Sequence, residues 1–258
     1  MLTFERYCAE IVAQADAMAG ALVGADLTTP VPSCPGWDVG QLVRHLGGGQ
    51  RWAATIVRTH ATEPPPDDHF RTVEGGGDPA VLGPWLSESA RELADALRSV
   101  GPDAEPWTPV AGRTSSFYAR RFAHETVLHR ADAALALGAP YDLADDLAID
   151  AVDEWMELGS LPEMLDFYPE RRALLGPGRT VHLHATDTPA DAHAEWVVDL
   201  TETLAWRRAH EKAAVAVRGP LTELLLVIYG RRSPTAGTVE VLGDDAWLDR
   251  WLRESSFG

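Results

Sequence analysis

The sequence predicts an α+β protein: a four-helix bundle followed by a smaller domain that mixes strands and helices. Four segments within residues 1–138 place apolar residues every three or four positions, which is the period of an amphipathic helix. Residues 179–244 instead contain short segments rich in alternating, β-branched and aromatic residues, which are typical of strands. We therefore expect a bundle over 1–140, a helical linker over 141–178 and an α+β domain over 179–258.

The first helix of the expected bundle lies near the N-terminus. Its apolar residues share one helical face. They are Phe4, Cys8, Ile11, Ala15, Met18 and Leu22. A turn-rich segment, TTPVPSCPG, follows, and Asp38 with Gln41 three positions later is the pattern of a capping box that opens a second helix.

The second helix carries His45 on its apolar face, and Gly47, Gly48 and Gly49 follow directly. Three glycines inside a helix cost about 2–3 kcal/mol relative to alanine. One interpretation is that His45 binds an ion and that the glycines make room beside it. The other is that the helix ends at Leu46 and the glycines terminate it.

A long loop and two more helices complete the expected bundle. Residues 63–80 are rich in Pro, Gly and acidic residues and predict a surface loop, in which Arg71 is a candidate for binding a substrate carboxylate. The third helix is expected over 82–100. The fourth spans 118–138 and ends at Gly138.

The C-terminal half alternates between short strands and helices. A helix is expected over 144–158, and its acidic residues are expected on a solvated face. Strand-like segments follow. They are RTVHLHAT, AEWVVDLTETLAW, AAVAVRG and GTVEVLGD. Two further helices are expected, one over 219–230 and one that Asp244 caps.

Composition narrows the classes of partner. The chain has 258 residues, is 45% hydrophobic and carries a formal net charge of −17. Nucleic-acid binding is not expected, because phosphate backbones are bound by clustered positive charge. No segment approaches about 18 consecutive apolar residues, and the N-terminus has no signal-peptide pattern. We expect a cytoplasmic protein with no membrane partner.

The fourth helix carries a stripe of ionisable side chains. Glu125, His129 and Asp132 recur at spacings of four and three residues, so they share one face. The segment HETVLH is not the zinc-protease motif, because its histidines are five apart and His124 points away from that face. A surface ion pair between Glu125 and His129 explains the spacing as simply as a binding site does.

A metal site is the alternative to the surface pair. His45 occupies the apolar face of another helix in the same bundle, and helix bundles build metal sites from side chains of facing helices. Two histidines and one glutamate, with one position left open, form the ligand set of catalytic zinc sites. His45, Glu125 and His129 are therefore candidate metal ligands.

Several motifs resemble one known family. The segments VPSCPGWDVGQLVRHLGG, AHETVLHRADAALALG, VRGPLTELLLVIYGRR and VEVLGDDAWLDRWL together resemble the mycothiol-dependent maleylpyruvate isomerases. The resemblance covers nearly the whole chain. It implies a DinB-like four-helix bundle followed by a domain resembling sterol-carrier folds.

The resemblance also implies functional roles. His45, Glu125 and His129 match ligands of a divalent ion, usually zinc. Asp132 matches a nearby acidic position that orients an imidazole, and Arg231 is the candidate for a catalytic arginine from the C-terminal domain. We expect Trp37, Gly48 and Gly49 to contact the thiol cosubstrate. The side chains of Trp37 and Trp52 would wall the pocket or pack in the core.

The chemistry that the resemblance implies is addition of a thiol to a small electrophile. A thiol bound to zinc is deprotonated, whereas a free thiol is mostly protonated at neutral pH. Mycothiol would supply the sulfur, and the reaction would be isomerisation or S-transfer. Alternatives are a zinc hydrolase of amides or esters, a non-haem iron enzyme, and a binding or sensing protein with a structural metal. Pairing into a homodimer is possible for such bundles.

Two other groups of residues are candidate sites. His182 and His184 point the same way on a strand, but without a third ligand we expect them to be solvated. Cys8 and Cys34 are expected to be inert, reduced side chains, with a reactive Cys34 as the alternative.

Overall fold

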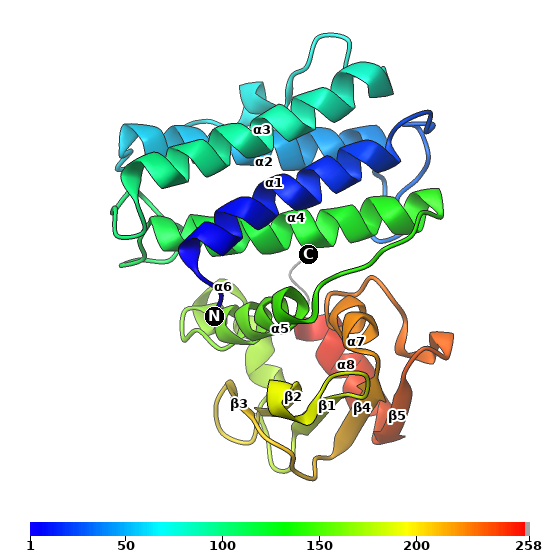
Figure 1. Cartoon of the computed structure of the whole chain (residues 1–258). Coiled ribbons are helices and arrows are strands. Elements are labelled where there is room, and N and C mark those ends of the chain that lie inside the picture. The colour runs from blue at the N-terminus through cyan, green and yellow to red at the C-terminus, as the bar shows by residue number, and fades with distance from the viewer. Residues whose placement is uncertain (256–258) are drawn as a thin grey trace. The chain divides into compact units, whose positions relative to one another are not determined.

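The chain folds into two compact units, residues 1–142 and residues 143–258. The structure is a computed structural model that describes residues 1–255, apart from the side chains of Asp68 and His69. The first unit is helical and the second combines helices with a sheet (Figure 1). The predicted α+β class is confirmed.

Four long helices build the first unit. They are α1 (Phe4–Ala21), α2 (Val39–Thr59), α3 (Pro79–Val100) and α4 (Ser115–Leu137). Helix α2 packs along α3 and also contacts α4, while α1 packs against both α3 and α4. The loop between α2 and α3 contains a short 3-10 helix, η1 (Asp68–Arg71), which lies against α2.

The predicted cap of α2 is present. Gln41 donates its backbone N–H to Asp38, and Asp38 donates its own N–H to the Gln41 side chain. The helix continues through the three glycines and ends where His60 adopts a left-handed conformation. The alternative in which the helix ends at Leu46 is therefore wrong.

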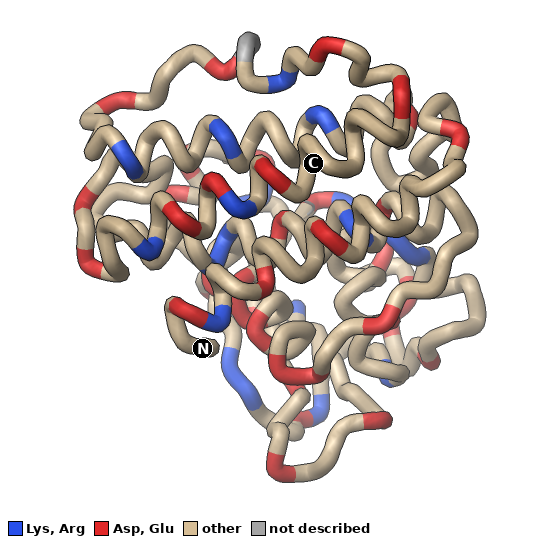
Figure 2. Tube along the Cα trace, turned by 45° about the horizontal axis from the view of Figure 1, so that its top comes forward, with Lys and Arg blue, Asp and Glu red and all other residues tan. Residues whose placement is uncertain are grey.

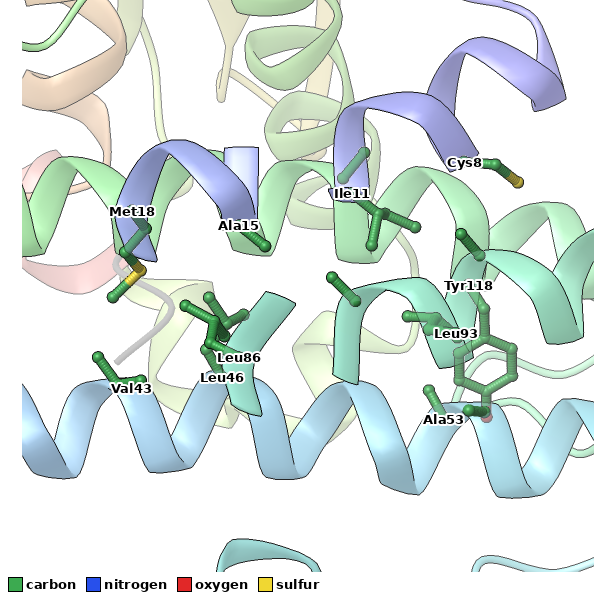
Figure 3. Packing of buried hydrophobic residues seen from close by; sticks show 14 of the residues in the cluster. Cys8, Ile11, Ala15, Met18, Val43, Leu46, Ala53, Leu86, Leu93 and Tyr118 are labelled. Atoms are coloured by element: carbon green, nitrogen blue, oxygen red, sulfur yellow. The ribbon is translucent and has the colours of Figure 1, made fainter. Parts of the chain in front are cut away.

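The core of the first unit lies between the helices. The apolar face of α1 points toward α2, α3 and α4, as Figure 3 shows for Ile11, Ala15 and Met18. These side chains have no exposed surface. Their burial against Leu86 and Leu93 holds α1 in place, because each buried aliphatic side chain contributes about 1.5–3 kcal/mol.

The second unit contains a five-stranded sheet flanked by helices. Its strands are β1 (Thr180–Ala185), β2 (Glu195–Asp199), β3 (Ala205–Arg208), β4 (Val215–Gly219) and β5 (Glu240–Gly243). The strand order is β3-β2-β1-β4-β5. Strands β1 and β4 are parallel, and the other neighbours are antiparallel. The segment predicted as one strand-rich stretch, 194–206, forms most of the β2–β3 hairpin.

The remaining elements of this unit are helical. They are α5 (Asp145–Gly159), α6 (Met164–Phe167), η2 (Pro169–Leu174), η3 (Ala190–Ala192), α7 (Leu221–Ile228), η4 (Pro234–Ala236) and α8 (Asp245–Ser255). Helix α7 packs on β1 and β4, and α5 packs on α7. From residue 143 onward, the segment expected as a linker is thus part of the compact second unit.

Helix α5 does not present a fully solvated acidic face, so that expectation is wrong. Asp150, Asp153 and Glu154 are buried. Asp153 accepts hydrogen bonds from Trp196 Nε1 at 2.8 Å and from Arg208 Nε at 3.1 Å. Lys and Arg positions are interspersed with Asp and Glu positions over the chain (Figure 2). Within residues 1–255, no helix combines the length and the apolar character needed to cross a bilayer.

Candidate functional site

One pocket of the first unit brings together the three predicted metal ligands. His45 comes from α2, and Glu125 and His129 come from α4. The cavity has a volume of about 440 Å³. It is lined by His45, Leu46, Gly48, Gly49, Trp52, Pro65, Pro66, Asp67, Arg71, Arg121, Phe122, Glu125 and His129.

The two imidazoles and the carboxylate are neighbours. The ring centres of His45 and His129 are 5.2 Å apart, and the rings are nearly perpendicular. His129 Nε2 lies 3.4 Å from Oε2 of Glu125. The ligand atoms of His45, Glu125 and His129 do not all lie within 4.8 Å of one another. Among the described residues, the group of metal-ligating side chains that meets this limit lies in the second unit. Joint coordination of an ion would therefore draw these side chains closer together.

His129 is held between two carboxylates. Its Nδ1 atom lies 3.0 Å from Oδ2 of Asp132, on the side opposite to Glu125. Burial disfavours protonation of His129, but the hydrogen bonds to Asp132 and Glu125 outweigh burial and raise its pKa to about 9. Asp132 thus fixes the orientation of the ring and leaves Nε2 facing the pocket.

Asp132 also connects α4 to the segment before α2. Ser33 donates its hydroxyl to Oδ1 of Asp132 at 2.5 Å, and the Cys34 sulfur lies 3.8 Å from Oδ2. The side chain of Asp132 has no exposed surface. Ser33 could not be predicted as a partner of Asp132 from the sequence, because 99 residues separate the two and no local pattern relates them.

Glu125 receives a second partner that sequence reasoning missed. Arg121 donates from Nη2 at 2.7 Å and from Nε at 3.0 Å to Oε1 of Glu125. Burial opposes ionisation, but the charges of Arg121 and His129 hold the pKa of Glu125 well below its usual range. The spacing of four residues on one helix was the available signal for this pair.

His45 has the opposite electrostatic character. Burial, together with the nearby charges of His129 and Arg71, lowers its pKa to about 4, so the imidazole is neutral at physiological pH. Its Nδ1 atom is buried and makes no hydrogen bond to any residue that the structure describes. The ring packs against Trp37, with centres 4.8 Å apart.

Two glycines of α2 leave space for side chains from other segments of the first unit. A Cβ atom on Gly47 would lie 2.3 Å from the Trp85 ring, and one on Gly48 would lie 2.6 Å from Cγ of Arg71. Gly47 and Gly48 therefore allow Trp85 and Arg71 to approach the helix backbone closely. The interpretation that these two glycines make room for an ion is corrected accordingly. Gly49 has only ordinary contacts, the nearest at 3.5 Å.

Of the predicted cosubstrate contacts, Gly48 and Gly49 line the pocket, whereas Trp37 packs against the His45 ring and is not among the lining residues. Trp52 lines the pocket and donates its indole N–H to the Pro65 carbonyl at 2.8 Å. This bond ties the loop after α2 to the pocket wall.

Two further candidates lie elsewhere. His124 is buried against Tyr7, with ring centres 6.0 Å apart, and is not among the residues that line the pocket. Arg231 belongs to the second unit, just after α7, where its Nη1 donates to the Tyr229 carbonyl at 2.7 Å. A catalytic role for Arg231 stays a prediction.

Comparison with known families gives two matches that together span most of the chain. Residues 8–134 match the N-terminal domain of mycothiol maleylpyruvate isomerase. Residues 146–250 match the corresponding C-terminal domain, the MDMPI C-terminal domain.

Two solved structures are similar to the chain. One is the crystal structure of the mycothiol-dependent maleylpyruvate isomerase, with a TM-score of 0.59, and the other is a histidine-to-alanine mutant of it, with a TM-score of 0.58. Each is 18% identical in sequence, and each alignment covers 93% of both chains. At this identity the likeness shows a shared fold. Comparison with curated protein sequences gives no significant match.

Proposed function

Because the chain belongs to the mycothiol-dependent maleylpyruvate isomerase family, an enzyme family, we propose that it uses a divalent ion to activate mycothiol toward a small electrophile. The ligands would be His45, Glu125 and His129. The observation that carries the proposal is the convergence of these three side chains, from two helices, on one pocket. Zinc is the ion that this donor set favours.

The residues fit a bound ion in three respects. Two imidazoles and one carboxylate leave a coordination position for an exogenous ligand. The buried Nδ1 atom of His45 lacks a hydrogen-bond partner among the described residues, and an unsatisfied buried nitrogen is costly. The low pKa of His45 keeps one of its ring nitrogens unprotonated and able to bind an ion at neutral pH.

When bound, the ion would lower the pKa of the cosubstrate thiol, so that a thiolate is present at neutral pH. The protein's own residues would position the groups around it. Asp132 holds Nδ1 of His129 and so directs Nε2 toward the pocket. Arg121 occupies Oε1 of Glu125, which leaves Oε2 on the side of His129.

The pocket walls indicate the class of electrophile. Phe122 and Trp52 supply apolar surface, and Arg71 supplies a guanidinium group that is partly exposed and paired with Asp67 at 2.7 Å. A planar guanidinium binds carboxylates through two parallel hydrogen bonds. We infer a small, carboxylate-bearing substrate that displaces Asp67 from Arg71. Arg231 would be a second cationic group for the reaction.

Metal content and thiol binding test this function. Protein without an affinity tag is purified as wild type, as His129→Ala and as the control His60→Asn, which changes an exposed histidine and keeps a residue that tolerates the left-handed conformation. We expect one bundle-site ion in the wild type and in the control, and its loss in His129→Ala with the circular-dichroism spectrum unchanged. Equal metal in all three proteins rejects the triad.

Activity is then assayed with mycothiol and maleylpyruvate as the first electrophile. Formation of the trans isomer without consumption of thiol indicates an isomerase, and a stable thioether indicates S-transfer. Turnover that does not depend on mycothiol contradicts the thiol mechanism and favours hydrolysis.

A further inference from the structure

Three histidines and a glutamate meet on the sheet of the second unit, whereas the pocket proposed above belongs to the first unit. His182 and His184 lie on β1, Glu195 lies on β2, and His210 follows β3. The possible ligand atoms of these four side chains all lie within 4.8 Å of one another. They are the group of His, Cys, Asp and Glu residues that meets this limit among residues 1–255, apart from Asp68 and His69.

Strand pairing creates this cluster. His182 and His184 are two residues apart, so their side chains leave the same face of β1. The antiparallel register places Glu195 directly opposite His184. The β2–β3 hairpin pairs Trp196 with Arg208, which brings His210 past the end of β3 to the same corner.

The three imidazoles are arranged around one point. His182 Nε2 and His184 Nδ1 each lie 2.9 Å from Oε2 of Glu195, and His210 Nδ1 lies 2.6 Å from the same oxygen. The three ring centres are 5.6–5.8 Å apart, and the rings are steeply inclined to one another. A carboxylate oxygen offers about two lone-pair sites, so three N–H donors exceed what this oxygen accepts with good geometry.

The same atoms suit a cation better. In a tetrahedral site with metal–nitrogen bonds of about 2.0–2.1 Å, neighbouring ligand atoms lie roughly 3.3–3.4 Å apart. The nitrogen atoms of this cluster therefore need to retreat from Oε2 by less than about 1 Å to admit an ion. Imidazole nitrogen with one carboxylate oxygen is a donor set typical of zinc, nickel and copper.

The surroundings permit an ion to enter and remain. The exposed fraction of the side chain is 8% for His182 and 76% for His210. The cluster is therefore buried at His182 and open to solvent at His210. That side faces a cavity of about 670 Å³ lined in part by His184, Glu195 and His210. Two arginines also line the cavity, but Arg208 is paired with Asp153 and Arg218 with Glu240.

We propose that His182, His184, Glu195 and His210 bind a first-row divalent transition-metal ion, independently of the bundle site. Four protein ligands complete a tetrahedral shell, which is the arrangement of a structural site. The ion would link β1, β2 and the segment after β3, and so stabilise the sheet.

Zinc stoichiometry of tag-free, metal-stripped protein tests the proposal. We expect two ions in the wild type, one in His129→Ala, one in His210→Ala and none in the double variant. His210 is suited to this test because its side chain is mostly exposed, so its replacement leaves packing intact. His193→Asn is the matched control, since His193 lines the same cavity outside the cluster and asparagine tolerates its left-handed backbone conformation. Two ions should remain in this variant.

Affinity and spectroscopy give independent readouts. In the His129→Ala background, Glu195→Gln should weaken zinc binding by about 100-fold or more, because loss of a ligand exceeds the 10–100-fold effect of losing its supporting contact. Cu²⁺ bound to His129→Ala should show nitrogen hyperfine structure that His210→Ala removes. Zinc should raise the Tm of His129→Ala and leave that of the double variant unchanged.

The outcomes separate this site from the bundle site. If His129→Ala binds no zinc, or if His210→Ala and Glu195→Gln bind zinc as the His193→Asn control does, the second site is refuted. If the wild type binds one ion that only the His210→Ala change removes, the second site stands and the proposed function of the bundle site fails.

Discussion

Nδ1 of His129 lies 3.0 Å from Oδ2 of Asp132, one turn further along α4, and the carboxylate that holds this ring is completely buried. A ligand histidine whose second nitrogen is fixed in this way has a defined tautomer and orientation. The pair therefore determines how His129 presents Nε2 to the pocket.

The first prediction concerns this contact. Asp132→Asn should lower the zinc affinity of the bundle site by about 10–100-fold, because an amide does not replace the charge that orients the imidazole. A competition titration with a chromophoric chelator measures the change. Ser33→Ala, which removes the hydrogen bond that Ser33 donates to Asp132, is the control and should have a much smaller effect. Equal losses in the two variants would mean that Asp132 acts only by holding Ser33.

The second prediction is a pH dependence of the metal-free protein. Folding raises the pKa of His129 from its ordinary value of 6.5 to about 9, since its hydrogen bonds to Asp132 and Glu125 outweigh burial. The folded state then binds the proton more tightly than the unfolded chain. Its stabilisation is complete below about pH 6.5 and is lost as the pH rises to about 9.

Urea unfolding of chelator-treated protein between pH 6 and 9 checks this dependence. The free energy of unfolding should fall across the window for the wild type, by up to roughly 3 kcal/mol, and the fall should be smaller in His129→Gln. His45→Gln is the control, because burial lowers the pKa of His45 to about 4 and places its effect at acidic pH. A profile that His129→Gln leaves unchanged would assign the dependence to other groups.

The third prediction separates two adjacent glycines. Gly48→Ala should displace Arg71, whose Cγ, Cα and N atoms lie within 2.6–3.2 Å of the added Cβ, and should raise the KM for a carboxylate substrate. Gly49→Ala meets only Phe122 at 3.5 Å and should be tolerated. It should stabilise α2 by about 0.5–1 kcal/mol, because alanine favours a helix more than glycine does.

Steady-state kinetics and thermal unfolding of the two variants measure these effects. The prediction is contradicted if the two variants have similar KM values and Gly48→Ala keeps the wild-type stability. Arg71 would then not require the absence of a side chain at position 48.

The fourth prediction concerns the two thiols. Cys8 has no exposed surface, and burial raises its pKa to about 11, so it should react slowly with a thiol reagent in the folded protein. Cys34 is partly exposed and should account for the fast-reacting thiol. Labelling of Cys34→Ser should leave only the slow phase, and denaturant should make Cys8 reactive. A fast phase that survives Cys34→Ser contradicts the assignment.

Local sequence signals were sufficient for the helices of the first unit. The capping box of Asp38 and Gln41 marks where α2 begins, and the left-handed Gly138 marks where α4 ends. The spacing of Glu125 and His129 also placed both side chains on one face. Such signals are reliable because capping and helical periodicity depend on residues within about one or two turns.

The spatial relationships between distant segments were decided by the tertiary structure. Packing of α2 against α4 brings His45 to His129, and the loop after α2 places Arg71 over Gly48. Helical periodicity alone did not distinguish a metal site from a surface ion pair between Glu125 and His129. It predicts which face of a helix a residue occupies, but it does not predict which other helix packs against that face.

The sheet shows the same division. The sequence by itself determined that His182 and His184 share a strand face, but only the register of β2 and the turn into β3 decided that Glu195 and His210 join them. Strand pairing joins residues far apart in the chain through backbone hydrogen bonds that carry little residue-specific information. A cluster assembled from two strands and the segment after a third is therefore visible only once the fold has formed.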